Sequence, residues 1–394
     1  MAECASRIRA PVAAMVTFMT SRLFQPIALD QIELPNRLVV APMCQYSADD
    51  GSATDWHLQH LSQLGYSGAG LVMVEATAIE RRGRITHGCL GLYSDDNEAA
   101  LKRVIDAARR LAGHARFGIQ LAHAGRKASS SVPWLGGAAL AANEDPWQTV
   151  SSSATAFGEG WHVPHALTAQ EIEATIDAFV QAAQRAVRIG FDVIEVHSAH
   201  GYLLHQFLSP LANTRNDQYG GSLENRMRLP LEVIRAVRRA VPAHVAVGLR
   251  VSSTDWVEGG WDVAQTIEYV REAKKLGIAY VCASSGGIRA GVQVPLKPGY
   301  QVDFARQIRA ATGVPTRAVG LITEPHQAEQ ILADGNADMI ALARAFLDDP
   351  RWGWHAADTL GAKTHFPSQY FMARGESWRK WRDQIAGAAA ATTR

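Results

Sequence analysis

The chain has 394 residues, of which 47% are hydrophobic and 20% are charged, a composition typical of a globular protein with an ample core. Its formal net charge of +1 gives no electrostatic reason to bind nucleic acid or an anionic membrane. The four cysteines are far apart and form no CxxC motif, and no apolar run reaches the length of a membrane span. We therefore expect a cytoplasmic protein with no zinc or iron–sulfur site.

Residues 1–21 contain a short apolar run, Val12 to Met19, preceded by two arginines. Because the run has no clear cleavage site, we interpret residues 1–21 as a disordered leader or an overlong start rather than as a signal peptide.

From Arg37 onward one pattern recurs eight times: a short apolar run, a loop of small or polar residues, and a helical stretch. The apolar runs are 37–43, 71–77, 117–122, 193–196, 245–251, 280–284, 316–321 and 339–343. The helical stretches include 95–112, 168–189, 222–240, 262–276, 301–312 and 324–333. Apolar strands that alternate with amphipathic helices indicate a parallel sheet. Eight such units predict an α/β fold, a single (β/α)8 TIM barrel. The alternative is a doubly wound sheet, but no Gly-rich dinucleotide fingerprint follows a strand.

The polar stretch 129–161 lies between the third strand and its helix, and we predict that it forms an insertion at the rim or a lid. We expect the barrel to span residues 22–360. Residues 361–394 are predicted to be a C-terminal tail that contributes to the site or to a subunit interface.

The stretch from Asp192 to Tyr202 is the centre of the predicted active site. It begins as a β-branched strand and places His197, His200 and Tyr202 at the end of that strand, with Gly201 between the last two. In a TIM barrel the C-terminal ends of the strands face the active site. Two imidazoles and a phenol there offer hydrogen bonds and a proton.

The other predicted strand ends carry hydrogen-bond donors and no carboxylate cluster. They are Cys44, Tyr46, Ala76, Gln120, His123, Arg250, Ser285, Gly286, Gly320 and Arg344. A metal hydrolase requires carboxylates or more histidines, and only Lys127 lies near a strand end as a Schiff-base candidate. A set rich in donors suits a reduced flavin or an enolate. Small residues after the last strands are typical of a phosphate site in this fold, and FMN is the simplest phosphorylated cofactor.

Several segments together carry a family resemblance. They are 36–38, 41–46, 74–78, 120–127, 191–204, 207–210, 217–226, 318–323 and 348–350. With these segments in order, about residues 22–360 resemble the Old Yellow Enzyme family of FMN-dependent ene-reductases. The resemblance is strongest to the bacterial branch that has a cysteine near the flavin and includes xenobiotic reductases.

The resemblance implies a role for each candidate residue. The flavin ring would contact Pro42, Met43, Cys44, Ala76, Gln120 and Arg250, with Gln120 at the pyrimidine edge. The ribityl phosphate would be held by Gly286, Gly320, Ala343 and Arg344. Cys44 would tune the flavin potential rather than act as a nucleophile. His197 and His200 would bind the substrate carbonyl, Tyr46 would add a hydrogen bond, and Tyr202 would protonate the substrate after hydride transfer from flavin N5.

The implied reaction is the NADPH-dependent reduction of the activated C=C bond of enones, enals and maleimides, with nitro compounds as further candidates.

Relatives share an arginine between subunits, which implies a homodimer or homotetramer. The corresponding segment, 370–375, is spaced differently here; Arg374 is the candidate, and Trp378 or Trp381 is the alternative pocket residue. Two interpretations of Lys127 remain open: a contact to a cofactor phosphate, or a position in a solvated loop. The alternatives for function are another FMN barrel dehydrogenase, a non-catalytic flavin-binding redox sensor and a flavin-free barrel lyase.

Overall fold

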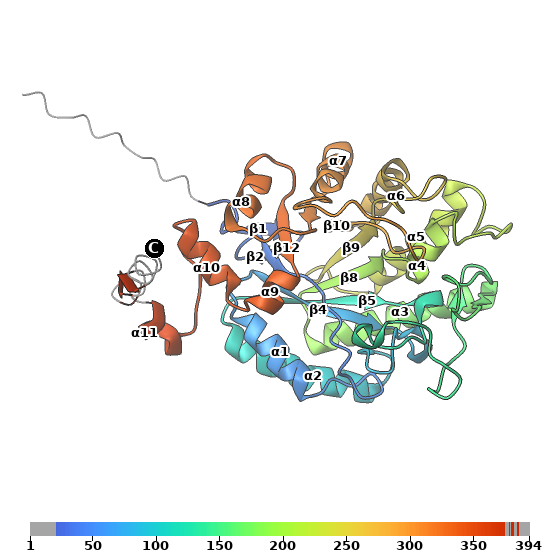
Figure 1. The fold of residues 1–394 in the computed structure, drawn as a ribbon, viewed down its shortest axis with the longest axis horizontal. Helices are drawn as coiled ribbons and strands as arrows, with labels where there is room; N and C mark the ends of the chain where they lie inside the picture. Colours follow the sequence, from blue (N-terminus) through green and yellow to red (C-terminus); the bar gives the residue numbers. More distant parts are fainter. Residues whose placement is uncertain (1–20, 375–377, 379, 382–383, 386–394) are drawn as a thin grey trace, which may run out of the picture.

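The computed structural model describes residues 21–374, 378, 380, 381, 384 and 385. The predicted leader, apart from Ser21, and most of the predicted tail beyond 374 lie outside these residues. Eight parallel strands close into a barrel (Figure 1), which confirms the predicted (β/α)8 fold. The strands are β3 (Leu38–Val40), β4 (Leu71–Ala78), β5 (Arg116–Ala122), β8 (Val193–Ser198), β9 (Ala246–Ser252), β10 (Tyr280–Ser284), β11 (Thr316–Ala318) and β12 (Met339–Leu342).

The helices surround the barrel, as the alternating pattern predicts. The longer helices are α1 (Asp55–Gly65), α2 (Asp95–Ala112), α3 (Ala169–Ile189), α5 (Leu223–Ala240), α6 (Val263–Lys275), α7 (Val302–Thr312), α8 (Pro325–Ala333) and α10 (Trp352–Thr359). The short ones are α4 (Leu203–Leu208), α9 (Arg344–Asp348), α11 (Phe371–Arg374), η1 (Arg81–Gly83), η2 (Gly125–Lys127), η3 (Pro133–Leu135) and η4 (Ser368–Tyr370). Helix α3 begins with a capping box in which the side chain of Thr168 accepts from Glu171 N–H and Glu171 bonds the backbone of Thr168.

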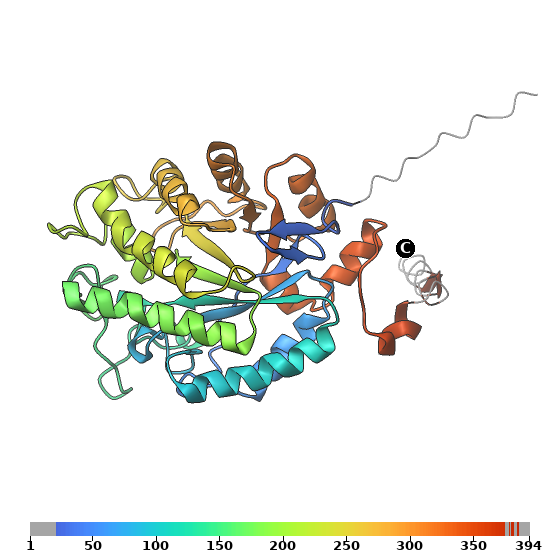
Figure 2. The same ribbon diagram turned by 180° about the vertical axis from the view of Figure 1, so that it is seen from behind.

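A β-hairpin closes the N-terminal end of the barrel. Its strands are β1 (Ile27–Leu29) and β2 (Ile32–Leu34), and they pair antiparallel. The buried side chains of Leu29 and Leu34 pack in one cluster with inward-facing barrel residues. Figure 2 shows the hairpin against the barrel on the side where the chain enters. The strand C-terminal ends are left open, and these carry the predicted site.

Two strands are shorter than the apolar pattern predicts. β11 ends at Ala318, and residues 319–321, predicted as strand, form a loop in which Leu321 has a φ of 50°. β3 ends at Val40, before the segment 41–46. Both segments remain near the barrel mouth, so apolar residues there line the site instead of extending the ladder.

The insertion between β5 and α3 reaches the mouth of the barrel. It contains η3 and a two-stranded parallel sheet, β6 (Val150–Ser151) with β7 (His165–Ala166). The ring of Trp134 in η3 meets the ring of Tyr46 edge-on, with 5.7 Å between centroids. Both views place the insertion and helix α11 at opposite ends of the molecule (Figures 1 and 2). Within the described residues, no helix combines the length and apolarity needed to cross a bilayer.

Candidate active site

Strand β8 and the turn after it deliver the three residues at the centre of the site. His197 lies in the strand, His200 follows it with a left-handed φ of 58°, and Tyr202 precedes α4 as its N-cap. Gly201 has a φ of 72°, and a Cβ there would lie 2.0 Å from the carbonyl oxygen of Gly287. Only glycine fits this close approach, so the turn is seated against the loop after β10.

The two imidazoles face each other at the barrel mouth. His197 Nε2 lies 3.3 Å from His200 Nδ1, and the Tyr202 ring is 4.9 Å from the His197 ring. Burial, followed by the charge of Arg250, lowers the pKa of both histidines well below the usual value, so both are neutral at neutral pH. His197 Nδ1 accepts from the Ala199 N–H at 3.2 Å. The single proton of neutral His197 is therefore on Nε2 and points toward His200.

Ser284, at the end of β10, forms a hydrogen bond with the imidazole of His200. Its Oγ lies 2.7 Å from His200 Nε2 and 3.4 Å from Gln301 Oε1. Gln301 is oriented by its own donation to the Val319 carbonyl at 3.2 Å. His197 Nε2–H donates to His200 Nδ1, so the proton of His200 is on Nε2, where it donates to Ser284 Oγ, and the Ser284 hydroxyl donates in turn to Gln301 Oε1. A carbonyl or phenolic oxygen can take over the N–H of His197 at this point.

Lys127 fixes the turn after β8 by hydrogen bonds. Its Nζ donates to the carbonyl oxygens of His200 at 2.9 Å and Gly287 at 3.1 Å, and it lies over the rings of Tyr202 at 5.3 Å and Phe157 at 4.7 Å. Burial, followed by the charge of Arg126, lowers the pKa of Lys127 to about 8. Its side chain is partly buried and committed to these two carbonyl oxygens, and it is not among the residues that line the cofactor cavity. A contact with a cofactor phosphate stays a prediction.

The segment after β3 carries Cys44 and Tyr46, and a buried carboxylate fixes it. The N–H of Gln45 donates to Glu75 Oε2 at 3.1 Å, while Glu75 Oε1 faces His57 Nε2 at 3.4 Å. Burial, followed by the charge of Glu75, raises the pKa of the Cys44 thiol well above its usual value. A protonated thiol is a poor nucleophile, in keeping with the tuning role implied by the resemblance.

The phenols of the site are protonated at neutral pH. Burial and neighbouring acidic groups, Cys44 first among them, raise the pKa of Tyr202 well above its usual value and also that of Tyr46. Tyr46 has a φ of 51°, a strained backbone of the kind that occurs at functional positions. Pro42 and Met43 lie in the same half-buried segment.

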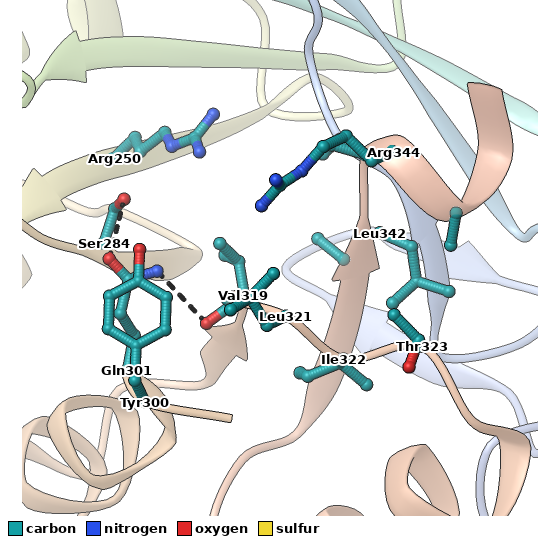
Figure 3. Close-up of a pocket in the computed structure, with 15 residues that line it drawn as sticks. Arg250, Ser284, Tyr300, Gln301, Val319, Leu321, Ile322, Thr323, Leu342 and Arg344 are labelled. Atoms are coloured by element: carbon teal, nitrogen blue, oxygen red, sulfur yellow. Dashed lines mark hydrogen bonds between the residues drawn. The ribbon is translucent and has the colours of Figure 1, made fainter. Parts of the chain in front are cut away.

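A cavity of about 370 Å³ adjoins the histidines. The predicted residues Arg250, Gly320, Ala343 and Arg344 line it, together with Ser284, Tyr300 and Gln301. In Figure 3 the guanidinium groups of Arg250 and Arg344 and the hydroxyl of Tyr300 point into this space. Arg250 Nε is buried and has no partner among the described residues. Two cations and several neutral donors fit a group that carries a phosphate and a ring rich in acceptors, as FMN does.

One predicted cofactor residue does not reach this cavity. Gly286 is absent from the lining, and its N–H donates to the Thr254 carbonyl at 2.7 Å. The amide is therefore committed to Thr254 in this structure, and the contact of Gly286 with the phosphate stays a prediction.

Ala76 and Gln120 are neighbours in the ladder between β4 and β5, beneath the mouth. The side chain of Gln120 donates through Nε2 to Glu195 Oε1 at 2.7 Å. Gln120 therefore faces the barrel interior, and the contact of both residues with the flavin stays a prediction.

Arg374 is not part of this chain's own site. Its guanidinium makes two bonds to Asp358, at 2.8 and 2.7 Å, and packs on the rings of Trp354 and Phe366. It lies in α11, at the opposite end of the molecule from the insertion (Figure 1). A role in a neighbouring subunit stays a prediction.

The sequence reasoning missed residues that act across the barrel. They are Lys127 as a clamp on the turn, Ser284 and Gln301 behind His200, Tyr300 in the cavity, and Glu195 with Tyr280 and Arg317 in the interior. One signal was available: Glu195 and Arg317 are opposite charges within short apolar strand runs, and charges buried in a barrel require partners.

Comparisons with known proteins agree with this geometry. A family model described as "NADH:flavin oxidoreductase / NADH oxidase family" matches residues 22–362. The chain is 43% identical over 391 residues to an NADH:flavin oxidoreductase of Gibberella zeae, covering 94% of each chain. It is 42% identical over 356 residues to an NADPH dehydrogenase of Listeria innocua, covering 90% of this chain and 99% of the relative.

The structure is also similar to that of morphinone reductase. The TM-score is 0.71 at 30% identity, and the match covers 90% of this chain and 93% of the other. The family model spans most of the chain, the cofactor of the family is FMN, and the cavity offers the donors that FMN requires. The chain belongs to the NADH:flavin oxidoreductase / NADH oxidase family, the Old Yellow Enzyme family.

Proposed function

We propose that this protein is an NADPH-dependent reductase of the activated C=C bond in α,β-unsaturated carbonyl compounds. The observation that carries the proposal is the pair of neutral imidazole nitrogens, His197 Nε2 and His200 Nδ1, 3.3 Å apart beside the Tyr202 phenol. The choice of NADPH follows the relatives named NADPH dehydrogenase.

When bound, FMN supplies hydride-transfer chemistry. The chain's own residues then have distinct tasks. His197 donates from Nε2 to the carbonyl oxygen of the substrate, and a shift of the His200 proton to Nδ1, with Ser284 donating to Nε2, supplies a second hydrogen bond. These bonds draw electrons away from the conjugated alkene. Because its pKa is raised by burial, Tyr202 holds its proton until a carbanion-like carbon develops beside it and then acts as general acid. Arg250 places a positive charge in the cofactor cavity, which favours an anionic reduced cofactor.

Three finer expectations are part of the proposal. We expect enones, enals, maleimides or nitro compounds as substrates, because the histidine pair recognises an oxygen and not a particular carbon skeleton. We expect a homodimer or homotetramer, as the resemblance implies, and a cytoplasmic location, as the scattered cysteines imply. Light scattering of the purified protein, combined with activity of Arg374→Ala, tests the assembly and the predicted contribution of Arg374 to a neighbouring site.

The decisive experiment is an anaerobic spectral titration. Protein loaded with FMN is reduced with NADPH and then mixed with cyclohexenone. The proposal predicts bleaching of the flavin absorbance by NADPH and its return with the enone, and absence of return contradicts enone reduction.

Two variants distinguish a role of Tyr202 as proton donor from a role in packing. Tyr202→Phe is expected to slow reoxidation by the enone by 10²–10⁴-fold, roughly the contribution of a general acid, and to leave bleaching by NADPH intact. Tyr269→Phe is the matched control, because this buried phenol contacts Ser198 Oγ at 3.1 Å and has no place in the site. Equal slowing in both variants would show that Tyr202 matters only for packing.

A further inference from the structure

Four side chains form a hydrogen-bonded belt inside the barrel, below the histidines. Gln120 Nε2 donates to Glu195 Oε1 at 2.7 Å, and the Tyr280 hydroxyl donates to Glu195 Oε2 at 2.8 Å. Arg317 also donates to Glu195 Oε2 and holds its guanidinium 4.9 Å from the centre of the Tyr280 ring. The four residues are at most 2% exposed. Alternate residues of a strand face the same side, so Glu195 and His197 are successive inward-facing positions of β8.

Stability alone does not explain this belt. A buried ion pair costs so much desolvation that apolar residues of similar volume often serve as well or better. The barrel also has a glycine where a side chain would clash with the belt: a Cβ on Gly248 would lie 2.2 Å from the Tyr280 ring. The belt ends at Gln120, the one member that the cofactor site also uses, and this points to a role in the site.

We infer that Glu195 is a positioning residue that fixes the orientation of the Gln120 amide, and that Arg317 and Tyr280 hold Glu195 for this purpose. An ionised carboxylate only accepts hydrogen bonds, so Gln120 must turn its NH2 toward Glu195. The carbonyl oxygen of Gln120 is then turned away, and no donor in the described part of the chain reaches it.

The free carbonyl oxygen matches one group of the cofactor. The pyrimidine edge of oxidised FMN has a single N–H, at N3, between two carbonyls, and an oxygen acceptor pairs with that N–H. This step rests on the proposed function, because it takes Gln120 as the residue that faces the pyrimidine edge. With the amide reversed, two donors would meet and one would be left unsatisfied.

The variant Glu195→Gln inverts this polarity without changing shape. Arg317 and Tyr280 are both donors, so they keep the carbonyl oxygen of the new amide on their side. Its NH2 then faces Gln120, and Gln120 must turn its own oxygen inward and its NH2 toward FMN. The exchanged double variant, Glu195→Gln with Gln120→Glu, restores an acceptor at the site, since a carboxylate at 120 accepts on both sides.

The experiment measures binding of FMN labelled with ¹⁵N at N3, by quenching of flavin fluorescence and by the N3–H signal in ¹H–¹⁵N spectra. We expect a slowly exchanging N3–H in the unaltered protein. In Glu195→Gln we expect its loss and a dissociation constant raised about ten- to hundredfold, the effect of one buried unsatisfied donor. The exchanged variant is expected to recover both the signal and most of the affinity.

Asp192→Asn is the control, because it removes the same charge from the residue just before β8. There Asp192 pairs with Arg109 at 2.7 Å. It should leave both readouts unchanged. The inference is overturned if Glu195→Gln keeps the affinity and the N3–H signal, or if the unaltered protein shows no protected N3–H. If Glu195→Gln does not fold, the exchanged variant alone tests the inference. Weak FMN binding together with a missing N3–H signal in that variant would then overturn it. Neither readout needs turnover, so FMN binding without enone reduction would refute the proposed function alone.

Discussion

Lys127 offers the sharpest test of how a nearby charge helps Tyr202 to give up its proton. Its ammonium lies 5.3 Å from the centre of the Tyr202 ring. With the charge of the phenolate taken at the ring centre, a unit charge at that distance stabilises it by roughly 3 kcal/mol at an effective dielectric constant of about 20, or about two pK units, against the opposing effect of burial. If about half of this is felt in the transition state of proton transfer, Lys127→Met should slow protonation of the substrate by about tenfold.

The pH dependence follows from the same charge. The pKa of Lys127 is about 8, so the cation is present below pH 8 and is lost as pH rises through it. The histidines titrate well below this range and Tyr202 well above it, while Arg126 has a pKa of about 10. The reoxidation of NADPH-reduced enzyme by cyclohexenone should therefore fall about fivefold between pH 7 and 9, most of the full tenfold difference between the charged and neutral forms.

Stopped-flow reoxidation from pH 6.5 to 9.5 measures the effect. Lys127→Met should be slow and independent of pH across this range, and Lys127→Arg, which stays charged, should be fast and equally flat. Reduction by NADPH serves as the internal control in each variant. The reasoning is refuted if Lys127→Met keeps both the rate and the pH profile of the unaltered protein.

The same pKa predicts how stability changes with pH. The folded-state pKa of about 8 lies below the ordinary value of 10.5, so between these values the unfolded chain binds the extra proton. The contribution of Lys127 to the free energy of unfolding should then rise with pH in this window. Urea unfolding at pH 7.5 and 9.5 measures it, and Lys127→Met should lack that part of the rise.

Three further variants test separate parts of the site. Ser284→Ala removes the 2.7 Å contact to His200 and should weaken binding of a phenol, measured by spectral titration, about fivefold, the value of one hydrogen bond; unchanged affinity would show that Ser284 does not set the His200 proton. Cys44→Ala should shift the flavin midpoint potential in dye-coupled titrations without abolishing turnover, because the thiol is protonated; complete inactivity would contradict a tuning role. Trp134→Ala opens the contact with Tyr46, and should raise kcat/KM for bulky enones relative to cyclohexenone if the insertion limits access; an unchanged ratio would remove it from the substrate pocket.

The barrel and the centre of the site could both be predicted from the sequence. Apolar runs alternating with amphipathic helices admit few folds, and the C-terminal ends of parallel strands converge in a barrel. His197, His200 and Tyr202 could be grouped because they lie within six residues of one another, on one strand and its turn. Arg250, Gly320 and Arg344 were found by the same rule at other strand ends.

Which distant residues act together depends on how the strands close into the barrel. Lys127 and His200 are 73 residues apart, His200 and Ser284 are 84 apart, and Glu195 and Arg317 are 122 apart. The first pair joins the segments after the neighbouring strands β5 and β8, the second joins the ends of β8 and β10, and the third meets inside the barrel between β8 and β11. Strand register sets which of these side chains share a level. Periodicity reports that a residue faces inward but not which residue it faces. For the same reason the sequence could not show that the N–H of Gly286 donates to the Thr254 carbonyl.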